Sequence, residues 1–432
     1  MLELLDLRNR RERLEPRHLE VDPGISATVG GLIERVRTGR DAALLELTLK
    51  FDGADLRESG LVATPEEFLA AREATPEPLR DALDALIRRL EGFHGRQLPP
   101  AWEEENAGVR FGEIVRPLRT AGCYVPGGRA SYPSSVAMTV VPARVAGVEE
   151  VVVCTPPAPD GSLNPAVLHA AERAGAEKVV KIGGAQAIAA MAFGTDSVPA
   201  VDRIVGPGNA YVTEAKRQLA GRVGIDGLAG PTELVVVADS RADIRTLTVD
   251  LIAQAEHDPA AIAILVTTDP VQVDAVRDSL EEEAVRTDRR EIVEGALGSS
   301  QAIVVGDMAQ AVEVVNDLAP EHLQLLLQDA RPFAEGVRNA GAIFVGPFTA
   351  VPFGDYGVAS NHVLPTAGTA RFASGLRASD FVTVSSVVEV SDEAAARLAP
   401  EVATIARSEG LFAHARAVEL RTERAPTSEA ER

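Results

Sequence analysis

The chain has 432 residues, of which 46% are hydrophobic and 25% are charged, and its formal net charge is −21. This composition is typical of globular proteins that bury a sizeable core, and it argues against a disordered chain. The negative charge argues against nucleic acids and anionic membranes as partners, because both are themselves polyanions.

Residues 1–21 are charged and poor in apolar residues, so we expect an N-terminal arm. The arm holds no apolar stretch long enough for a signal peptide. The chain nowhere holds the run of about 18 apolar residues that a membrane span needs. We therefore expect a cytoplasmic protein without a membrane segment.

The middle of the chain alternates short β-branched runs with Ala-rich helical segments. The predicted buried strands are 151–154, 178–182, 203–205, 234–237, 263–267, 302–305 and 342–345. The predicted helices between them include 165–173, 244–257 and 271–283. Near-continuous apolar strands separated by helices predict an α/β fold in which helices cover both faces of parallel sheets.

The C-terminal region differs from this pattern. Residues 394–421 are predicted to be helical with interruptions at Pro400 and Gly410, and the last ten residues are predicted to be a disordered tail. The two cysteines, Cys123 and Cys154, are too few for a disulfide framework or a thiolate metal cluster. Any metal site must therefore use His, Asp, Glu, Gln or Asn.

The segment DLIAQAEHDP holds the first candidate site. Gln254 and His257 are three residues apart in a predicted helix, so both side chains share one face. Asp258 and Pro259 end this helix beside His257. The pair could bind a metal, or it could be an ordinary polar helix C-terminus, where the helix dipole favours histidine.

The segment NDLAPEHLQL holds the second candidate. Pro320 suits the first turn of a helix, which predicts Glu321 and His322 at a helix N-terminus. The dipole there favours an ionised carboxylate and a neutral imidazole. Such a pair could act as a water activator and a general base. An acidic first turn with a chance histidine is the alternative.

Two further segments carry chemical groups. Residues 346–368 form a Gly- and Pro-rich loop that contains Asp355 and His362, and long ordered loops are often functional. A surface loop with a turn at Gly354 is the alternative. Glu409 and His414 lie in the C-terminal helical region, where a solvated helix face is the alternative reading.

Three glycine-rich segments, GCYVPGGRASYP, KIGGAQAIAA and VGPGNAYVTEAK, follow or flank predicted strands. Each could turn backbone amides toward a phosphate at a helix N-terminus. None of them is G-x-G-x-x-G, so spacing alone leaves plain turns as the alternative to nucleotide binding.

Taken together, the motifs resemble the histidinol dehydrogenase family in order and spacing from about residue 20 to residue 420. They are GCYVPGG, GGAQAIAAMAFGT, VGPGNAYV, IDGLAGPTE, DLIAQAEHDP, APEHLQ, GDYGVASNHVLPT and EGLFAHA. The resemblance implies a zinc- and NAD-dependent enzyme that oxidises L-histidinol to L-histidine through L-histidinal, at the end of histidine biosynthesis.

The resemblance also implies roles for individual residues. The implied ligands of one zinc per subunit are Gln254, His257, Asp355 and His414. The implied catalytic pair is Glu321 and His322. The implied substrate contacts are Thr232, His362 and Glu409, together with His322 and the zinc ligands. The implied NAD contacts are Tyr124, Gln186 and Asn209. Position 232 is Thr where many relatives carry Ser, and both residues offer a hydroxyl.

For the architecture, the resemblance implies two related, incomplete Rossmann-like domains with helical arms at both ends. The first, at 22–122 and 232–375, would carry the metal and catalytic site, and the second, inserted at 123–231, would bind NAD. The tail at 376–432 would reach into the partner's active site in a homodimer.

Two other functions remain open. Enzymes of similar sequence oxidise other small alcohols such as sulfonated diols, although His362 and Glu409 favour histidinol. A zinc hydrolase or lyase could use the same metal ligands and Glu-His pair to activate water. The absence of a G-x-G-x-x-G fingerprint keeps this second alternative open.

Overall fold

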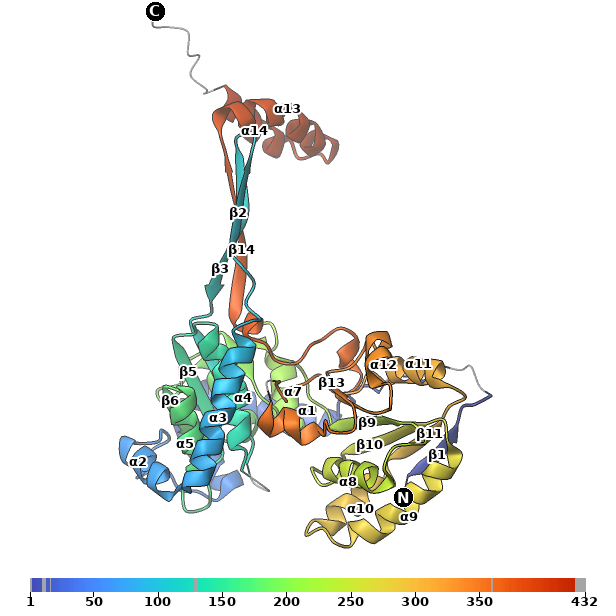
Figure 1. Cartoon of the computed structure of the whole chain (residues 1–432). Helices are drawn as coiled ribbons and strands as arrows, with labels where there is room; N and C mark the ends of the chain where they lie inside the picture. Colours follow the sequence, from blue (N-terminus) through green and yellow to red (C-terminus); the bar gives the residue numbers. More distant parts are fainter. Residues whose placement is uncertain (1, 10–12, 16, 128–130, 359, 424–432) are drawn as a thin grey trace, which may run out of the picture. The chain divides into compact units, whose positions relative to one another are not determined.

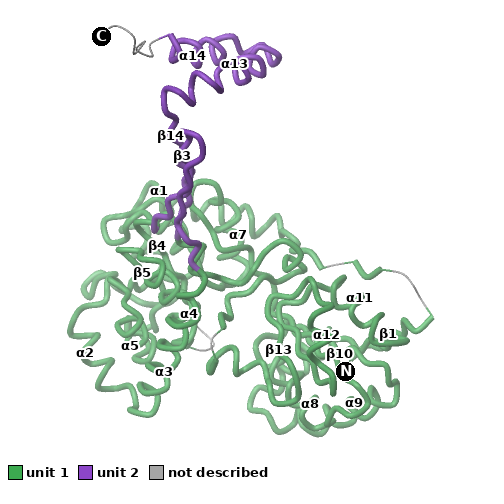
Figure 2. Tube along the Cα trace, turned by 45° about the horizontal axis from the view of Figure 1, so that its top comes forward, with its two compact units in different colours: residues 1–97, 118–381 green, residues 98–117, 382–432 purple. Residues whose placement is uncertain are grey.

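The computed structural model describes residues 2–9, 13–15, 17–127, 131–358 and 360–423. It divides into two compact units (Figure 2): unit 1 is Met1–Gln97 with Leu118–Phe381, and unit 2 is Leu98–Pro117 with Val382–Arg432. No helix among the described residues combines the length and the apolar character that crossing a membrane requires. The predicted disordered tail falls almost wholly on residues 424–432, which lie outside the described residues.

A six-stranded parallel sheet forms one half of unit 1 (Figure 1). Its strands in spatial order are β1 (Glu3–Asp6), β11 (Gln301–Val304), β10 (Ile262–Thr267), β9 (Glu233–Ala238), β12 (His322–Leu326) and β13 (Ala342–Val345). Alternate residues of β9 enter two different apolar clusters: Leu234 and Val236 enter one, and Val235 and Val237 enter the other. Both faces of this sheet are therefore buried, as the apolar strands predicted.

Helices cover the two faces of the six-stranded sheet. One cluster includes residues of α8 (Ile244–Ala255), α9 (Pro270–Ala284) and α10 (Arg290–Gly298). The other includes residues of α11 (Met308–Leu318) and α12 (Ala330–Gly336). The N-terminal segment joins this half through β1, because Leu2 and Leu7 at its ends are buried in the two clusters.

A five-stranded parallel sheet forms the other half of unit 1. Its order is β6 (Lys178–Lys181), β5 (Glu150–Thr155), β4 (Thr120–Tyr124), β7 (Arg203–Val205) and β8 (Gly224–Ile225). Its helices are α4 (Pro133–Val145), α5 (Pro165–Ala174), α6 (Gly184–Phe193) and α7 (Ala210–Leu219). The strands β9 to β13 are arranged around β9, and the strands β4 to β8 are arranged around β4. In each sheet the next two strands along the chain lie on one side of this first strand, and the last two lie on its other side. The two halves thus share one doubly wound topology, which confirms the predicted α/β class.

Three N-terminal helices pack on the five-stranded layer. They are α1 (Pro23–Asp52), α2 (Pro65–Ala74) and α3 (Glu77–His94), which contact helices among α4 to α7. Val29 and Leu44 of α1 share an apolar cluster with Val152 and Ile188. The sequence expectation grouped residues 22–122 with the other domain. Helices α1 to α3 instead pack on the five-stranded layer, because the apolar residues of α1 are buried in the cluster of that layer.

Unit 2 contains a three-stranded antiparallel sheet and two helices. The sheet order is β14 (Val382–Val390), β3 (Val109–Pro117) and β2 (Trp102–Asn106). Ala107 and Gly108 have φ of 49° and 77° and form the two-residue turn between β2 and β3. The helices α13 (Asp392–Ser408) and α14 (Phe412–Thr422) meet through a small alanine-rich cluster.

The C-terminal prediction is correct at Gly410, whose φ of 75° separates α13 from α14. It is wrong at Pro400, which lies inside α13, and it missed β14, since 376–432 was expected to be a helical tail. The β14 strand exposes nearly all its side chains, so its sequence lacks the buried apolar pattern by which the other strands were predicted.

The prediction for residues 320–322 is also wrong. Helix α11 ends before Ala319, which has φ 47°, and His322 begins the strand β12 instead of a new helix. Leu323 and Leu325 of this strand are buried in an apolar cluster of the sheet. Burial between β9 and β13 therefore outweighs the helix-start signal of Pro320.

Candidate active site

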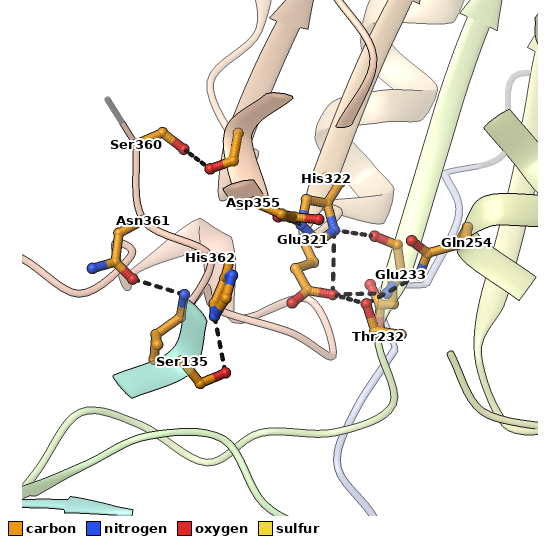
Figure 3. A network of polar contacts seen from close by, with 12 residues as sticks. Ser135, Thr232, Glu233, Gln254, Glu321, His322, Asp355, Ser360, Asn361 and His362 are labelled. Atoms are coloured by element: carbon orange, nitrogen blue, oxygen red, sulfur yellow. Dashed lines mark hydrogen bonds and ion pairs between the residues drawn. The ribbon is translucent and has the colours of Figure 1, made fainter. Parts of the chain in front are cut away.

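The predicted Glu-His pair lies where β9 and β12 begin (Figure 3). Thr232 directly precedes β9, and Glu321 directly precedes β12, its neighbour in the sheet. Because the two strands are parallel, their amino ends lie side by side. Thr232 and Glu321, which are 89 positions apart in the sequence, therefore come within hydrogen-bonding distance. The usual ligand position in such sheets is at the carboxyl ends, so this half places its polar groups at the opposite edge.

Glu321 is held as a buried carboxylate. Its Oε2 accepts hydrogen bonds from the Thr232 hydroxyl at 2.6 Å and from the backbone N–H of Glu233 at 2.8 Å. Burial acts to raise the pKa of Glu321, but the neighbouring His322 and these donors hold it below its usual value. The carboxylate is therefore ionised and fixed in orientation.

His322 is buried and makes its contacts through one ring nitrogen. Its Nδ1 lies 3.1 Å from the Glu233 carbonyl oxygen and 3.5 Å from Glu321 Oε2. Its Nε2 is buried without a hydrogen-bond partner and lies 4.0 Å from Asp355 Oδ1. A buried ring nitrogen left free in this way is a candidate for proton transfer to a ligand.

The charge state of His322 differs from the sequence prediction of a neutral imidazole. Burial acts to lower its pKa, but Glu321 and Asp355 outweigh burial and raise it to about 9. The predicted helix N-terminus, which would have favoured the neutral form, does not exist at this position.

Thr232 connects the pair to Gln254. The Thr232 hydroxyl accepts a hydrogen bond from Gln254 Nε2 at 3.0 Å while it donates to Glu321. Gln254 is buried in the last turn of α8, and His257 follows the end of that helix and is exposed. Thr232 therefore provides a hydroxyl that bridges Gln254 and Glu321.

Asp355 is buried within a single π-helical turn, Phe353–Gly357, in the long 346–368 loop. Turns of π-helix are rare in proteins, and those that occur are often found at functional sites. The turn lies close against the sheet: a Cβ added to Gly354 would be 2.6 Å from the Phe344 ring, so only glycine fits there. The backbone that carries Asp355 is thus set by contact with β13.

His362 faces a residue of the five-stranded half. Its Nε2 lies 3.1 Å from the hydroxyl of Ser135 in α4. The preceding Asn361 is buried and donates to the Met138 carbonyl of α4 at 2.7 Å. Burial lowers the pKa of His362, which favours its neutral form. The long loop therefore joins the two halves of unit 1 through α4.

A cavity of about 680 Å³ adjoins the network. Thr232 and His257 line it, together with Tyr132, Gly208 and Asn209 of the five-stranded half. Its walls therefore carry predicted substrate-binding, metal-binding and NAD-binding residues.

A second cavity, of about 930 Å³, lies over the five-stranded sheet. Tyr124, Gln186 and Asn209 all line it, and they follow or end β4, β6 and β7. These are carboxyl ends on both sides of the point where strand order reverses, which is where doubly wound sheets bind nucleotides. The cavity is also of the size that cofactor sites have.

The three residues are held by local contacts. The Tyr124 hydroxyl accepts a hydrogen bond from Gly184 N at 3.0 Å, and burial raises the Tyr124 pKa to about 12. Asn209 Oδ1 caps α7 by accepting from the backbone of Tyr211 and Val212. Its amide N–H groups are therefore the donors left for a ligand.

Comparison with known proteins decides the family. The family model described as histidinol dehydrogenase matches residues 16–422. The histidinol dehydrogenase of Synechococcus sp. is 47% identical over 397 residues, which cover 91% of this chain and 92% of that protein. That of Moorella thermoacetica is 45% identical over 425 residues, 98% of this chain and 100% of that protein. The crystal structure of histidinol dehydrogenase from Elizabethkingia anophelis has a TM-score of 0.93, with 33% identity and 98% of both chains covered.

The chain belongs to the histidinol dehydrogenase family. It is therefore an oxidoreductase, and family membership supports the oxidation of histidinol in histidine biosynthesis.

The resemblance to histidinol dehydrogenases predicts a zinc site formed by nitrogen and oxygen ligands of the chain. Within the described part of the chain, no three His, Cys, Asp or Glu side chains gather as a metal site. The predicted set has two such residues in unit 1, His257 and Asp355, with Gln254 as the third ligand there. Gln254 and Asp355 are buried at the two ends of the Thr232–Glu321–His322 network (Figure 3). Nitrogen and oxygen donors of this kind suit zinc, manganese or cobalt.

The remaining predicted residues of the histidinol dehydrogenase site lie in unit 2. Glu409 follows the last residue of α13, and His414 lies in α14, and both are exposed there. The roles of Glu409 and His414, like those of the site residues in unit 1, stay predictions.

Sequence reasoning missed Glu233 and Ser135. Glu233 donates its N–H to Glu321, and its carbonyl oxygen contacts His322. Its side chain is buried and accepts from Ala367 N, and burial raises its pKa to about 7. A charged residue at the start of the apolar run ELVVVA was the available signal. Ser135 offered no comparable signal.

Proposed function

We propose that the protein carries out the zinc- and NAD-dependent four-electron oxidation of L-histidinol to L-histidine through L-histidinal. The observation that carries the proposal is His322, a buried histidine whose Nε2 has no hydrogen-bond partner, next to an ionised glutamate whose partner Thr232 lines the smaller cavity. Alcohol oxidation needs such a base near a hydride acceptor.

Tyr124, Gln186 and Asn209 would bind NAD, and Gln254, His257 and Asp355 would hold zinc together with His414. When bound, NAD would supply the hydride acceptor for each oxidation, and zinc would supply a cation that orients the imidazole and amine of the substrate and offsets the charge of nearby carboxylates. His362 and Thr232 would add substrate contacts, as would Glu409.

The chain's own residues would handle the protons. His322, once a bound cation offsets the charge of the carboxylates beside it and leaves the imidazole neutral, would remove the hydroxyl proton at Nε2 in the first oxidation and release it to solvent. Glu321 would then accept a proton from water as it adds to the aldehyde, and His322, having released the first proton to solvent, would take the proton of the hydrate in the second oxidation. Both hydrogen bonds to Glu321 end on Oε2, so Oε1 is the oxygen available to water. Two NAD molecules are used per histidine formed.

A homodimer with a shared active site is part of the proposal. Unit 2 exposes large apolar side chains, including Val388 at 66%, Ile405 at 62% and Phe412 at 69%. Exposed apolar side chains in so small a unit are the usual sign of a protein interface. A partner covering them could bring Glu409 and His414 to the other subunit's site.

A stoichiometric assay tests the function. Zinc-loaded protein is given L-histidinol and excess NAD, and NADH and histidine are both counted. We expect two NADH per histidine. One NADH per substrate would contradict the second oxidation, and no NADH from histidinol would send the substrate search to other alcohols or to hydrolysis.

The Glu321→Gln variant should separate the two oxidations. We expect aldehyde oxidation to fall about 100-fold, because the amide cannot accept a proton from water, while alcohol oxidation falls less. Separate assays with L-histidinol and L-histidinal measure the two effects. The control is Glu313→Gln on the exposed face of α11, which should leave both rates unchanged. Equal damage to both oxidations by Glu321→Gln would rule out its role as water activator.

A further inference from the structure

The two cavities of unit 1 share part of their walls. Pro126, Gly127 and Asn209 line both of them. The smaller cavity contains Thr232 and His257, beside the Glu321–His322 pair. A dinucleotide in the larger cavity must therefore direct its reactive ring toward the shared wall, which leaves its adenosine half for the residues farther away.

Asp52 is one of the residues that line the larger cavity and not the smaller one. It is the last residue of α1, and Gly53, with φ 74°, ends the helix directly after it. Among the described residues lining the cavity, Asp52 is the only one with a formally charged side chain. The rest of the lining is apolar or neutral, and no described lysine, arginine or histidine faces it there.

The carboxylate of Asp52 is energetically unfavourable in the free protein. Its Oδ2 is buried and has no hydrogen-bond partner. Burial raises the Asp52 pKa to about 6, and the C-terminal end of a helix disfavours negative charge. A buried acceptor without a donor in a ligand cavity indicates that the ligand supplies the donor.

The ligand group that fits is a neutral pair of hydroxyls. We propose that Asp52 binds the ribose hydroxyls of the adenosine half of NAD and thereby excludes cofactors phosphorylated at the 2′ position. This inference rests on the proposed use of NAD. The ribose diol offers two donors to one carboxylate, whereas a 2′-phosphate would bring negative charge against Asp52 with no described cation beside it.

Direct binding of reduced cofactors tests the inference. Zinc-loaded protein is titrated with NADH and with NADPH, and the fluorescence of the bound nicotinamide reports Kd without turnover. We expect the wild type to bind NADH at least about tenfold more tightly than NADPH. Asp52→Asn should weaken NADH about tenfold, as loss of a charge-assisted hydrogen bond does, without weakening NADPH.

The matched control is Asp55→Asn. Asp55 is an exposed acid three residues along the chain, paired with Arg57, and it does not line the cavity. This variant should keep both Kd values. Asp52→Ser, checked for folding by circular dichroism, should also lose selectivity, so a folding defect in one variant cannot decide the outcome.

A third probe distinguishes the ribose from the base. Reduced nicotinamide hypoxanthine dinucleotide lacks the adenine amino group but keeps the diol, so Asp52→Asn should weaken it as much as NADH. An effect confined to NADH would mean that Asp52 binds the adenine amine and would overturn the inference. Unchanged selectivity in Asp52→Asn would also overturn it, whereas a wild type that binds neither cofactor would contradict the proposed NAD dependence itself.

Discussion

Replacing His322 with Asn is expected to abolish both oxidations. Asn lacks a basic nitrogen at the place of Nε2, the buried atom that has no partner in the free protein. The loss of a positioned general base should lower kcat for L-histidinol and for L-histidinal by about 10²- to 10⁴-fold. Steady-state assays with each substrate measure the two values.

Two readouts separate catalysis from structure in this variant. Zinc content and NADH affinity should equal those of the wild type, because His322 is outside the predicted metal and NAD ligands. His169→Asn provides a control: His169 is another buried histidine whose ring nitrogens have no hydrogen-bond partner, it is located on α5, and its replacement should leave kcat nearly unchanged. Loss of zinc from His322→Asn would contradict the separation of base and ligand roles.

Removing the metal is expected to abolish histidinol oxidation while leaving NADH binding intact. The cavity with Tyr124 and Gln186 lies on the five-stranded sheet, whereas the predicted ligands Gln254 and Asp355 belong to the other half of unit 1. A chelator should therefore remove activity, and added zinc should restore it. NADH fluorescence titration of the metal-free protein should give the wild-type Kd.

Metal analysis of each sample makes the chelation experiment decisive. Manganese and cobalt, which also accept nitrogen and oxygen donors, should restore activity in part. Full activity in protein shown to be free of metal would contradict the zinc site. Loss of NADH binding together with the metal would instead contradict the placing of the NAD site and the metal site in different halves of unit 1.

The strands illustrate what local sequence can determine. The runs at β5, β7, β9 and β10 are apolar because both faces of each sheet are covered, and this pattern is visible without any structure. The two-half α/β architecture follows from it. In contrast, β2, β3 and β14 form an exposed antiparallel sheet, whose side chains mix polar and apolar residues without a buried face.

The site shows the same division. Family motifs in the sequence pointed to Glu321, His322, Thr232, Gln254 and Asp355, and contacts within unit 1 link all five into one network. The backbone conformation of the Glu-His pair could not be predicted from Pro320, because the burial of Leu323 and Leu325 in the sheet favours a strand there.

The sequence by itself determined the family, the α/β class and most of the candidate residues, since these depend on residue types at fixed spacing along the chain. Only the tertiary structure revealed Glu233 beside the pair, Ser135 facing His362, and Asp52 in the larger cavity. It also placed Asp355 of the 346–368 loop beside His322, whose pKa depends on this carboxylate and on that of its sequence neighbour Glu321. Distance and burial control these interactions, and both are properties of the folded chain, whatever the separation in sequence.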